Sequence, residues 1–391
     1  MNLAQKNMLL LLRSAITGEK LEIAEPVDIN AICREAQRHS ILALMYEGAV
    51  NCGVDKSLDG MGKLLNVYYS ELMLSEKQLA LVKKICNTFD ANGVDYVLLK
   101  GSKLKWLYPK PELRKMGDAD ILIHESDYPK ARVLVEELGF SKNETDGDHS
   151  RDFSSKYLCL ELHVRFVERH VFPQVVEYFD GIWNRVKLVE GHRYELTPED
   201  EFMVIFIHFM KHFLWGGVGC RHICDLWVYL EKMPEIDINF VEKELESLHM
   251  VNFFKNTLKT IKVWFEGEKG DEKTDLITDF VLKCGSWGTK ETHAIASGAR
   301  THQEVGDAEK VRSRTIWKTV FPSLADMRKS FTVLEKHPYL LPVFWGVRLV
   351  RALLFRRESI KRKAYEIKMV SAENVETHVE MWRLLGVELS E

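Results

Sequence analysis

The sequence contains two aspartates two positions apart, Asp118 and Asp120, that stand at the start of an apolar run. If this run forms a strand, residues i and i+2 point to the same face, so the two carboxylates converge. Two negative charges side by side repel one another unless a cation lies between them. Oxygen pairs of this kind suit Mg²⁺, which often binds one or two carboxylates together with substrate phosphates. The pair therefore predicts a site for Mg²⁺, for which Mn²⁺ could substitute.

A third acid, Glu161, lies in the run Leu160-Glu161-Leu162-His163, where its apolar neighbours do not fit an exposed loop. A third carboxylate would complete a site for two metal ions. His163 shares a strand face with Glu161, so it could contact the metal ligands or an acceptor. A hydrogen-bonded core histidine is the alternative for this residue.

A phosphate-binding segment is expected at Lys100-Gly101-Ser102, where a strand over residues 94–99 turns into a helix. Glycine lets the backbone approach a ligand closely, and the first amides of a helix are free to bind phosphate. Lys100 and Arg114 add cationic side chains within reach. An Asp-x-Asp pair by itself is more typical of a solvated turn. The glycine-serine turn before it and the acid after it are what favour an active site.

A small sheet is needed to bring these residues together. The apolar patterns between residues 91 and 195 predict the order strand, helix, strand, helix, strand. The expected ranges are 94–99, 104–108, 119–123, 127–138 and 157–166. This order is typical of an α+β fold, here a small mixed β-sheet core embedded in largely helical N- and C-terminal regions.

The rest of the chain is predicted to be helical. Four segments are expected: an N-terminal helical region over 1–90, the sheet core over 91–195, a helical domain closing the cleft over 196–330, and a basic helical segment over 331–391. Loops are expected at 267–271 and 298–306, which begin or end at glycines.

A second wall of the site is expected on the helical domain, because no segment within 91–190 predicts a pocket for an acceptor. Helical spacing puts two histidines on one face, and charged residues accompany them. The candidates for this wall are His208, Lys211, His212, Arg221 and Asp225. A zinc site and plain packing of the helical domain are the alternatives. The Phe-Met-Lys sequence between the two histidines lacks the glutamate of a metalloprotease helix.

The composition excludes a disordered chain and limits the choice of partners. Of 391 residues, 46% are hydrophobic and 29% are charged, as in globular proteins with a sizeable core. Lys and Arg number 54 against 58 Asp and Glu, so the net charge of −4 does not favour a chain-wide surface for nucleic acid. A basic stretch over 348–363 could meet RNA phosphates or a membrane surface, or be a solvated helix face.

Cysteine usage and hydropathy predict a cytoplasmic protein. The seven cysteines, an odd number without a CxxC pair, favour a reducing compartment. The most apolar stretch, over 339–355, is interrupted by Arg348 and Arg351, whereas a membrane span needs about 20 apolar residues. No transmembrane segment is therefore predicted, and the N-terminus shows no signal-peptide pattern.

The order of these motifs resembles the nucleotidyltransferase superfamily that includes DNA polymerase β and the aminoglycoside nucleotidyltransferases. The chain is more closely similar to a bacterial family of uncharacterised nucleotidyltransferases. The matching residues are Leu99-Lys100-Gly101-Ser102, Arg114, Gly117-Asp118-Ala119-Asp120-Ile121-Leu122, Glu161-Leu162-His163, His208, Lys211-His212, Arg221 and Asp225-Leu226. Ala119 departs from the larger aliphatic residue usual between the two acids, which should change packing beneath the strand without removing a ligand.

The resemblance implies Mg²⁺-dependent transfer of a nucleoside monophosphate from a nucleoside triphosphate, such as ATP, to a small molecule, a protein or an RNA. The implied catalytic and metal-binding set is Asp118, Asp120 and Glu161, and the implied nucleotide-binding set is Lys100, Gly101, Ser102 and Arg114. The first set would hold two Mg²⁺ ions, with Glu161 nearest the acceptor, where it could help to deprotonate it.

Two other functions stay open at this point. One is a catalytically inactive protein that binds nucleotides, and the other is a toxin-type nucleotidyltransferase that modifies tRNA. Decay of an active site usually removes a carboxylate early, so the intact acids argue against the first. The basic stretch weakly favours the second and the net charge of −4 weakly opposes it.

Overall fold

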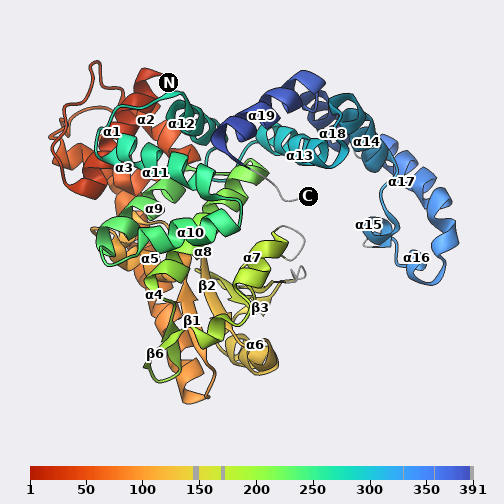
Figure 1. The fold of residues 1–391 in the computed structure, drawn as a ribbon, viewed down its shortest axis with the longest axis horizontal. Helices are drawn as coiled ribbons and strands as arrows, with labels where there is room; N and C mark the ends of the chain where they lie inside the picture. Colours follow the sequence, from red (N-terminus) through yellow and green to blue (C-terminus); the bar gives the residue numbers. More distant parts are fainter. Residues whose placement is uncertain (144–148, 169–171, 329, 356, 388–391) are drawn as a thin grey trace. The chain divides into compact units, whose positions relative to one another are not determined.

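The computed structural model describes residues 1–143, 149–168, 172–328, 330–355 and 357–387 (Figure 1). The chain divides into two compact units. Of the described residues, the first contains those within 1–211 and 218–287, and the second contains those within 212–217 and 288–387. The whole sheet and the predicted acid site lie in the first unit.

The chain begins with four helices that precede the sheet. They are α1 (Leu3–Thr17), α2 (Ile29–Arg38), α3 (Leu42–Asn51) and α4 (Met61–Ala91). The side chains of Asn2 and Asp28 cap α1 and α2 by accepting hydrogen bonds from amides of the first turn. These caps satisfy backbone donors that a helix leaves free, and so fix where the helices begin.

A mixed sheet, to which the described residues contribute seven strands, forms the centre of the first unit. The strands are β1 (Tyr96–Leu99), β2 (Asp118–Ile123), β3 (Ser141–Lys142), β4 (Ser150–Ser154), β5 (Cys159–His163), β6 (Lys187–Glu190) and β7 (Arg193–Glu195). Their order across the sheet is β3-β4-β5-β2-β1-β7-β6. The central β2 is antiparallel to β1 and parallel to β5. The predicted α+β class is confirmed, although the sheet is wider than the three strands that the sequence patterns indicate.

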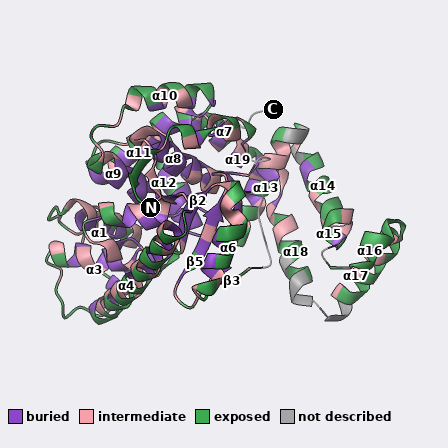
Figure 2. Ribbon diagram, turned by 90° about the horizontal axis from the view of Figure 1, so that it is seen from below, coloured by how far each residue is buried: buried purple, intermediate pink, exposed green. Residues whose placement is uncertain are grey.

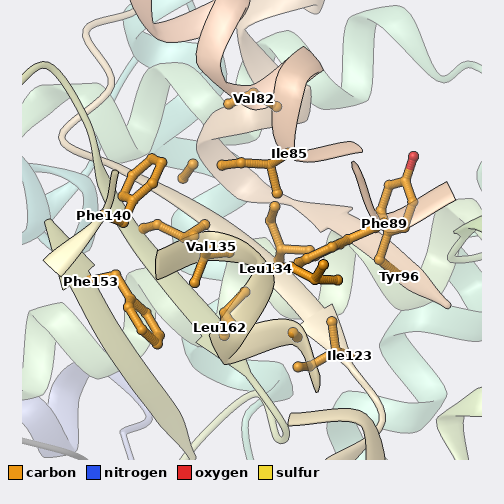
Figure 3. Close-up of a cluster of buried hydrophobic side chains, with 14 of the residues drawn as sticks. Val82, Ile85, Phe89, Tyr96, Ile123, Leu134, Val135, Phe140, Phe153 and Leu162 are labelled. Carbon is orange, nitrogen blue, oxygen red and sulfur yellow. The ribbon is translucent and has the colours of Figure 1, made fainter. Parts of the chain in front are cut away.

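One face of the sheet is covered by helices and forms a hydrophobic core. Alternate residues of β2, such as Ile121 and Ile123, pack with Phe89 of α4 and Leu134 of α6 (Tyr128–Glu137), as Figure 3 shows for part of the cluster. Side chains alternate along a strand, so the acidic residues between them must point to the opposite face. Ala119 belongs to the core face, where it is fully buried.

The opposite face of the sheet is the one that carries the acids. The short helix α7 (Pro173–Tyr178) and the turn η4 (Ile182–Asn184) lie over the end of β2 on this face, since both line a cavity with Leu122. The strands β2 and β5 themselves are largely buried (Figure 2). An acid on such a strand is therefore partly withdrawn from water.

Further helices complete the first unit. They are α8 (Pro198–Trp215), which runs on into the second unit, α9 (Cys220–Lys232), α10 (Ile238–Ser247), α11 (Val251–Phe265) and α12 (Glu272–Cys284). Aromatic side chains join α8 to α11: the ring of Phe206 packs edge-on against Phe254, with centroids 5.2 Å apart. Such pairs add about 0.5–1.5 kcal/mol to the burial of their area.

The second unit is helical in the part that the structure describes. Its helices are α13 (Lys290–Val305), α14 (Ala308–Val320), α15 (Leu324–Arg328), α16 (Val333–Lys336), α17 (Leu341–Phe355), α18 (Arg357–Met369) and α19 (Ala372–Leu385). Arg356, in the basic stretch, lies outside the described residues. In the described parts of the chain, no helix has the length and apolarity to cross a membrane.

The loop predicted over 298–306 is wrong, because α13 runs through it to Val305. Gly298 is a packing residue rather than a helix breaker. A Cβ added there would lie 2.9 Å from the side chain of Val375 and 3.0 Å from that of Val370. The glycine lets neighbouring segments approach closely, and this contact offsets the cost of about 1 kcal/mol for glycine within a helix.

Candidate active site

The strand register brings the acids together. Because β2 and β5 are parallel neighbours, Asp120 lies opposite Glu161, and Leu122 lies opposite His163. Ligand atoms of Asp120, Glu161 and His163 all lie within 4.8 Å of one another. Asp118 lies on the same strand face as Asp120, two residues earlier. The four side chains thus form one cluster on the face opposite the core, which we call the acid cluster.

Two cations already lie against Asp120. The Lys100 Nζ lies 2.9 Å from Asp120 Oδ1, and His163 Nε2 also lies 2.9 Å from this oxygen. His163 Nε2 lies 3.2 Å from Glu161 Oε2 as well, while its Nδ1 faces the carbonyl oxygen of Arg165 at 3.2 Å. Both ring nitrogens therefore face oxygen atoms, and this favours the doubly protonated imidazolium.

The charges in the cluster act on one another strongly. Burial lowers the pKa of His163, but its hydrogen bonds to the two carboxylates outweigh this and raise it above the ordinary value. Burial would raise the pKa of Asp120, yet Lys100 and His163 hold it well below its usual range. For Asp118, burial and the charges of Asp120 and Glu161 act together and raise the pKa to about 6. The surroundings of Asp118 therefore disfavour its charged form.

The donor set fits a divalent metal ion. Asp118, Asp120 and Glu161 supply carboxylate oxygens, which are the ligands that hard cations such as Mg²⁺ prefer. Burial, with the charges of Asp120 and Glu161, disfavours the charged form of Asp118. A metal ion bound among the three carboxylates would stabilise that charged form.

The turn after β1 is built for close approach. The helix α5 (Lys100–Leu104) begins directly after β1, and Lys100 adopts a positive φ of 37°. A Cβ added at Gly101 would lie 3.0 Å from the Asp118 carbonyl oxygen and 3.1 Å from a guanidinium nitrogen of Arg114. The Ser102 hydroxyl is buried and lies 2.8 Å from the Leu99 carbonyl oxygen. The Ser102 side chain thus fastens the turn, and its contact with phosphate stays a prediction.

Arg114 and Asp225 form a buried ion pair with each other. The Arg114 Nε and its terminal nitrogen each donate to one carboxylate oxygen of Asp225, both at 2.8 Å. The Tyr108 hydroxyl donates to Asp225 at 2.8 Å. The pair joins the segment before β2 to helix α9. Sequence reasoning assigned the two residues separately, to the nucleotide and to the second wall, and it missed Tyr108, whose sequence context carries no signal for this role.

Arg221 of α9 lies near the acid cluster. One of its terminal nitrogens donates to the Lys115 carbonyl oxygen at 3.0 Å, and its charge lowers the pKa of Asp118. Its Nε is buried and has no hydrogen-bond partner within the described residues. Burial, with Arg114 nearby, lowers the pKa of Arg221 itself. Burial therefore destabilises the charged form of Arg221, and an anion bound near it would stabilise that form.

The remaining wall candidates have varied surroundings. Lys211 binds both carboxylate oxygens of Glu168, at 2.9 and 2.8 Å. The ring of His208 lies 5.8 Å from that of His222 between centroids. His212 belongs to the second unit, where its Nδ1 lies 3.1 Å from the Gly217 carbonyl oxygen. None of these three contacts involves a residue of the acid cluster.

Comparisons with known proteins address the kind of enzyme. Residues 25–266, more than half of the chain, match a family model described as uncharacterised nucleotidyltransferase. No curated protein matches the sequence. A solved structure, the solution structure of the antibiotic-resistance factor ANT(2″)-Ia, aligns over 50% of this chain and 100% of its own, with 13% identity and a TM-score of 0.33. This TM-score is too low to support an inference about this chain.

Proposed function

The chain belongs to this family of nucleotidyltransferases, and we propose that it moves a nucleoside monophosphate from a nucleoside triphosphate, such as ATP, to a hydroxyl or amine of an acceptor. The observation that carries the proposal is the acid cluster. Three carboxylates from two neighbouring strands converge there beside cations from other elements. Burying neighbouring carboxylates costs stability, and clusters of this kind are typical of functional sites that bind cations.

Asp118, Asp120 and Glu161 would hold Mg²⁺, two ions in our proposal, with Mn²⁺ as a substitute. When bound, the metal supplies positive charge that neutralises the triphosphate and activates the α-phosphate. His163 positions the acids, because it bridges Asp120 and Glu161 and is itself fixed by the Arg165 carbonyl.

The triphosphate would lie along the turn after β1. The backbone amides of Gly101 and Ser102 would bind the β- and γ-phosphates, and Lys100 lies beside them. Arg221 would stabilise negative charge near Asp118, since its guanidinium is short of a partner. Arg114 would act as a positioning residue that holds the turn and α9 together.

Glu161 would be the carboxylate that meets the acceptor. About 29% of its side chain is exposed, against 4% for Asp120. Glu161 would accept the proton of the acceptor hydroxyl or amine as the acceptor atom forms its bond to the α-phosphorus. The bond from the α-phosphorus to the bridging oxygen breaks, and its electron pair leaves with pyrophosphate.

All seven cysteines are free thiols in the structure. Free thiols are typical of reducing compartments. This supports our proposal that the enzyme works in the cytoplasm.

The test is to incubate the protein with Mg²⁺, a cell lysate and triphosphates labelled at either the α- or the γ-phosphate. We expect a product labelled from the α-position only, and none with chelator. Label from the γ-position would instead indicate a phosphotransferase. Binding without any transfer would identify an inactive nucleotide-binding protein, and label that ribonuclease releases would identify an RNA acceptor.

A further inference from the structure

A cavity of about 240 Å³ lies on the acid-bearing face of the sheet, at the end of β2. Apolar and aromatic residues such as Leu122, Phe166, Phe179 and Trp183 line it, together with the charged residues Glu125, Arg165 and Asp180. We call it the aromatic pocket. It lies within residues 122–183, where the sequence predicted no pocket, because segments that are separate in the sequence form its walls.

The aromatic pocket lies on the same face of the sheet as the acids. Leu122 follows Asp120 by two residues on β2, so their Cα atoms are about 7 Å apart along the strand. Leu122 also lies opposite His163 in the register with β5. A ligand that fills the pocket would therefore reach the acid cluster at the His163 side.

The pocket walls are held in place by specific contacts. The rings of His124 and Trp183 stack with centroids 3.8 Å apart, and those of Phe166 and Phe179 lie 4.5 Å apart. The Arg165 carbonyl, in the wall, receives the His163 Nδ1–H, and the Arg165 guanidinium binds Glu125 at 2.8 Å. His163 therefore connects Arg165, which lines the pocket, to the carboxylates of Asp120 and Glu161.

The size and chemistry of the pocket define what it can bind. Sites for whole drug-sized molecules measure about 300–1,000 Å³, so this one suits a single ring system and not a whole nucleotide. Aromatic walls favour a flat aromatic ring through offset or edge-on packing.

Position along β2 separates the pocket from the turn that we assign to the triphosphate. This turn follows Leu99, which lies opposite Asp120. The pocket begins farther along β2, at Leu122, which lies opposite His163. A ligand in the pocket would therefore meet the acids from the end of β2 away from the turn, where the acceptor would approach.

We propose that the aromatic pocket binds an aromatic ring of the acceptor and holds its hydroxyl or amine toward Glu161. This inference rests on the proposed nucleotidyl transfer and names the class of acceptor. The same ring chemistry could come from a free small molecule or from an aromatic side chain of a protein.

Binding can be tested without knowing the acceptor, with 5-fluoroindole as the probe. The full-length protein is titrated and the fluorine signal of the probe is followed by NMR. Val176→Trp fills the pocket from α7, and Trp183→Ala removes a wall. The matched control is Val133→Trp, at an exposed position of α6. We expect at least about tenfold weaker binding in both pocket variants, and unchanged binding in the control.

A second measurement separates the two substrates. A triphosphate analogue with a non-cleavable α,β-link, saturating with Mg²⁺, should leave probe binding in place. Displacement of the probe would mean that the pocket holds the nucleobase, and equal probe affinity in the wild type and both pocket variants would mean that the probe binds elsewhere. Either result overturns the proposal.

Transfer assays complete the test. Both pocket variants should lose transfer to the lysate acceptor at least about tenfold while their melting temperature and affinity for the triphosphate stay near wild type. Passage of the labelled product through a small-pore membrane would identify a small molecule, and retention would identify a protein side chain. Undiminished transfer in both variants contradicts the pocket proposal, whereas no transfer by the wild type contradicts the proposed function alone.

Discussion

At the scale of single residues, the two aspartates of the pair are not equivalent. Asp120 is paired with Lys100 and His163, and its charged form is stabilised. Asp118 feels burial and two neighbouring carboxylates, and its charged form is disfavoured. The same residue type, two positions apart, therefore contributes to stability with opposite sign.

Asp120→Asn should lower the free energy of unfolding, because Lys100 and His163 lose their shared anion. Removing one partner of a buried ion pair costs about 3–5 kcal/mol, and the amide oxygen of asparagine retains part of that. Asp118→Asn should be neutral or stabilise by about 1 kcal/mol, because it relieves repulsion. Urea unfolding without divalent metal measures both, and transfer should be lost in both. Equal free energies of unfolding for Asp118→Asn and Asp120→Asn would contradict the difference that we infer between the two aspartates.

Arg221→Ala should weaken binding of the Mg²⁺-triphosphate by about 10–100-fold, because hydrogen bonds to charged groups contribute about 1.5–3 kcal/mol. Isothermal titration calorimetry measures the affinity, and urea unfolding checks that the fold is retained. Arg132→Ala is the control, since Arg132 pairs with Glu136 on the surface of α6. If both variants bind the triphosphate alike, Arg221 does not contact it.

At the scale of elements, the site depends on the link between the segment before β2 and helix α9. Arg114 lies against Gly101 of the turn and is fixed by Asp225 of α9. The Lys105 Nζ donates to the Arg114 carbonyl oxygen at 2.6 Å, and burial lowers the pKa of Lys105 to about 8. These buried contacts hold β1, β2 and α9 in one arrangement.

Asp225→Asn should destabilise the protein by about 3 kcal/mol, because it leaves the buried Arg114 guanidinium without a negative partner. Glu136→Gln, which breaks the surface pair with Arg132, should cost no more than about 1 kcal/mol. Urea unfolding of both variants at neutral pH gives the comparison. If Asp225→Asn and Glu136→Gln lower the free energy of unfolding equally, the buried pair contributes no more to stability than the surface pair.

At the scale of the whole molecule, stability should depend on pH through His39. This side chain is fully buried, and its Nδ1 accepts a hydrogen bond from the Cys220 backbone amide. Burial, with the charge of Arg38, lowers the pKa of His39 from 6.5 to about 4. The unfolded chain therefore binds a proton between these pH values that the folded chain does not, so stability falls as the pH falls through this window.

Wild type should lose about 2 kcal/mol between pH 7.5 and pH 5.0 through His39 alone. His39→Asn keeps an acceptor but does not titrate, so its loss over this range should be smaller by that amount. Unfolding in urea at the two pH values measures the difference. Parallel pH profiles for the two proteins would show that His39 is not the group responsible.

The sequence by itself determined the features that depend on neighbours in the chain. Alternation along a strand places Asp118 and Asp120 on one face, and Gly101 marks where the backbone must approach β2. The α+β class and the transferase family follow from the same motifs. These properties are local, so a single sequence contains them.

Only the tertiary structure decided which charges pair and where a ring can bind. Arg114 and Asp225 are 111 residues apart, and Lys100 reaches Asp120 across the sheet. The aromatic pocket combines the end of β2 with segments near residues 165 and 180. Which charged residues pair depends on distances that are set only when the chain folds. A buried charge pairs with the opposite charge that the packing places beside it.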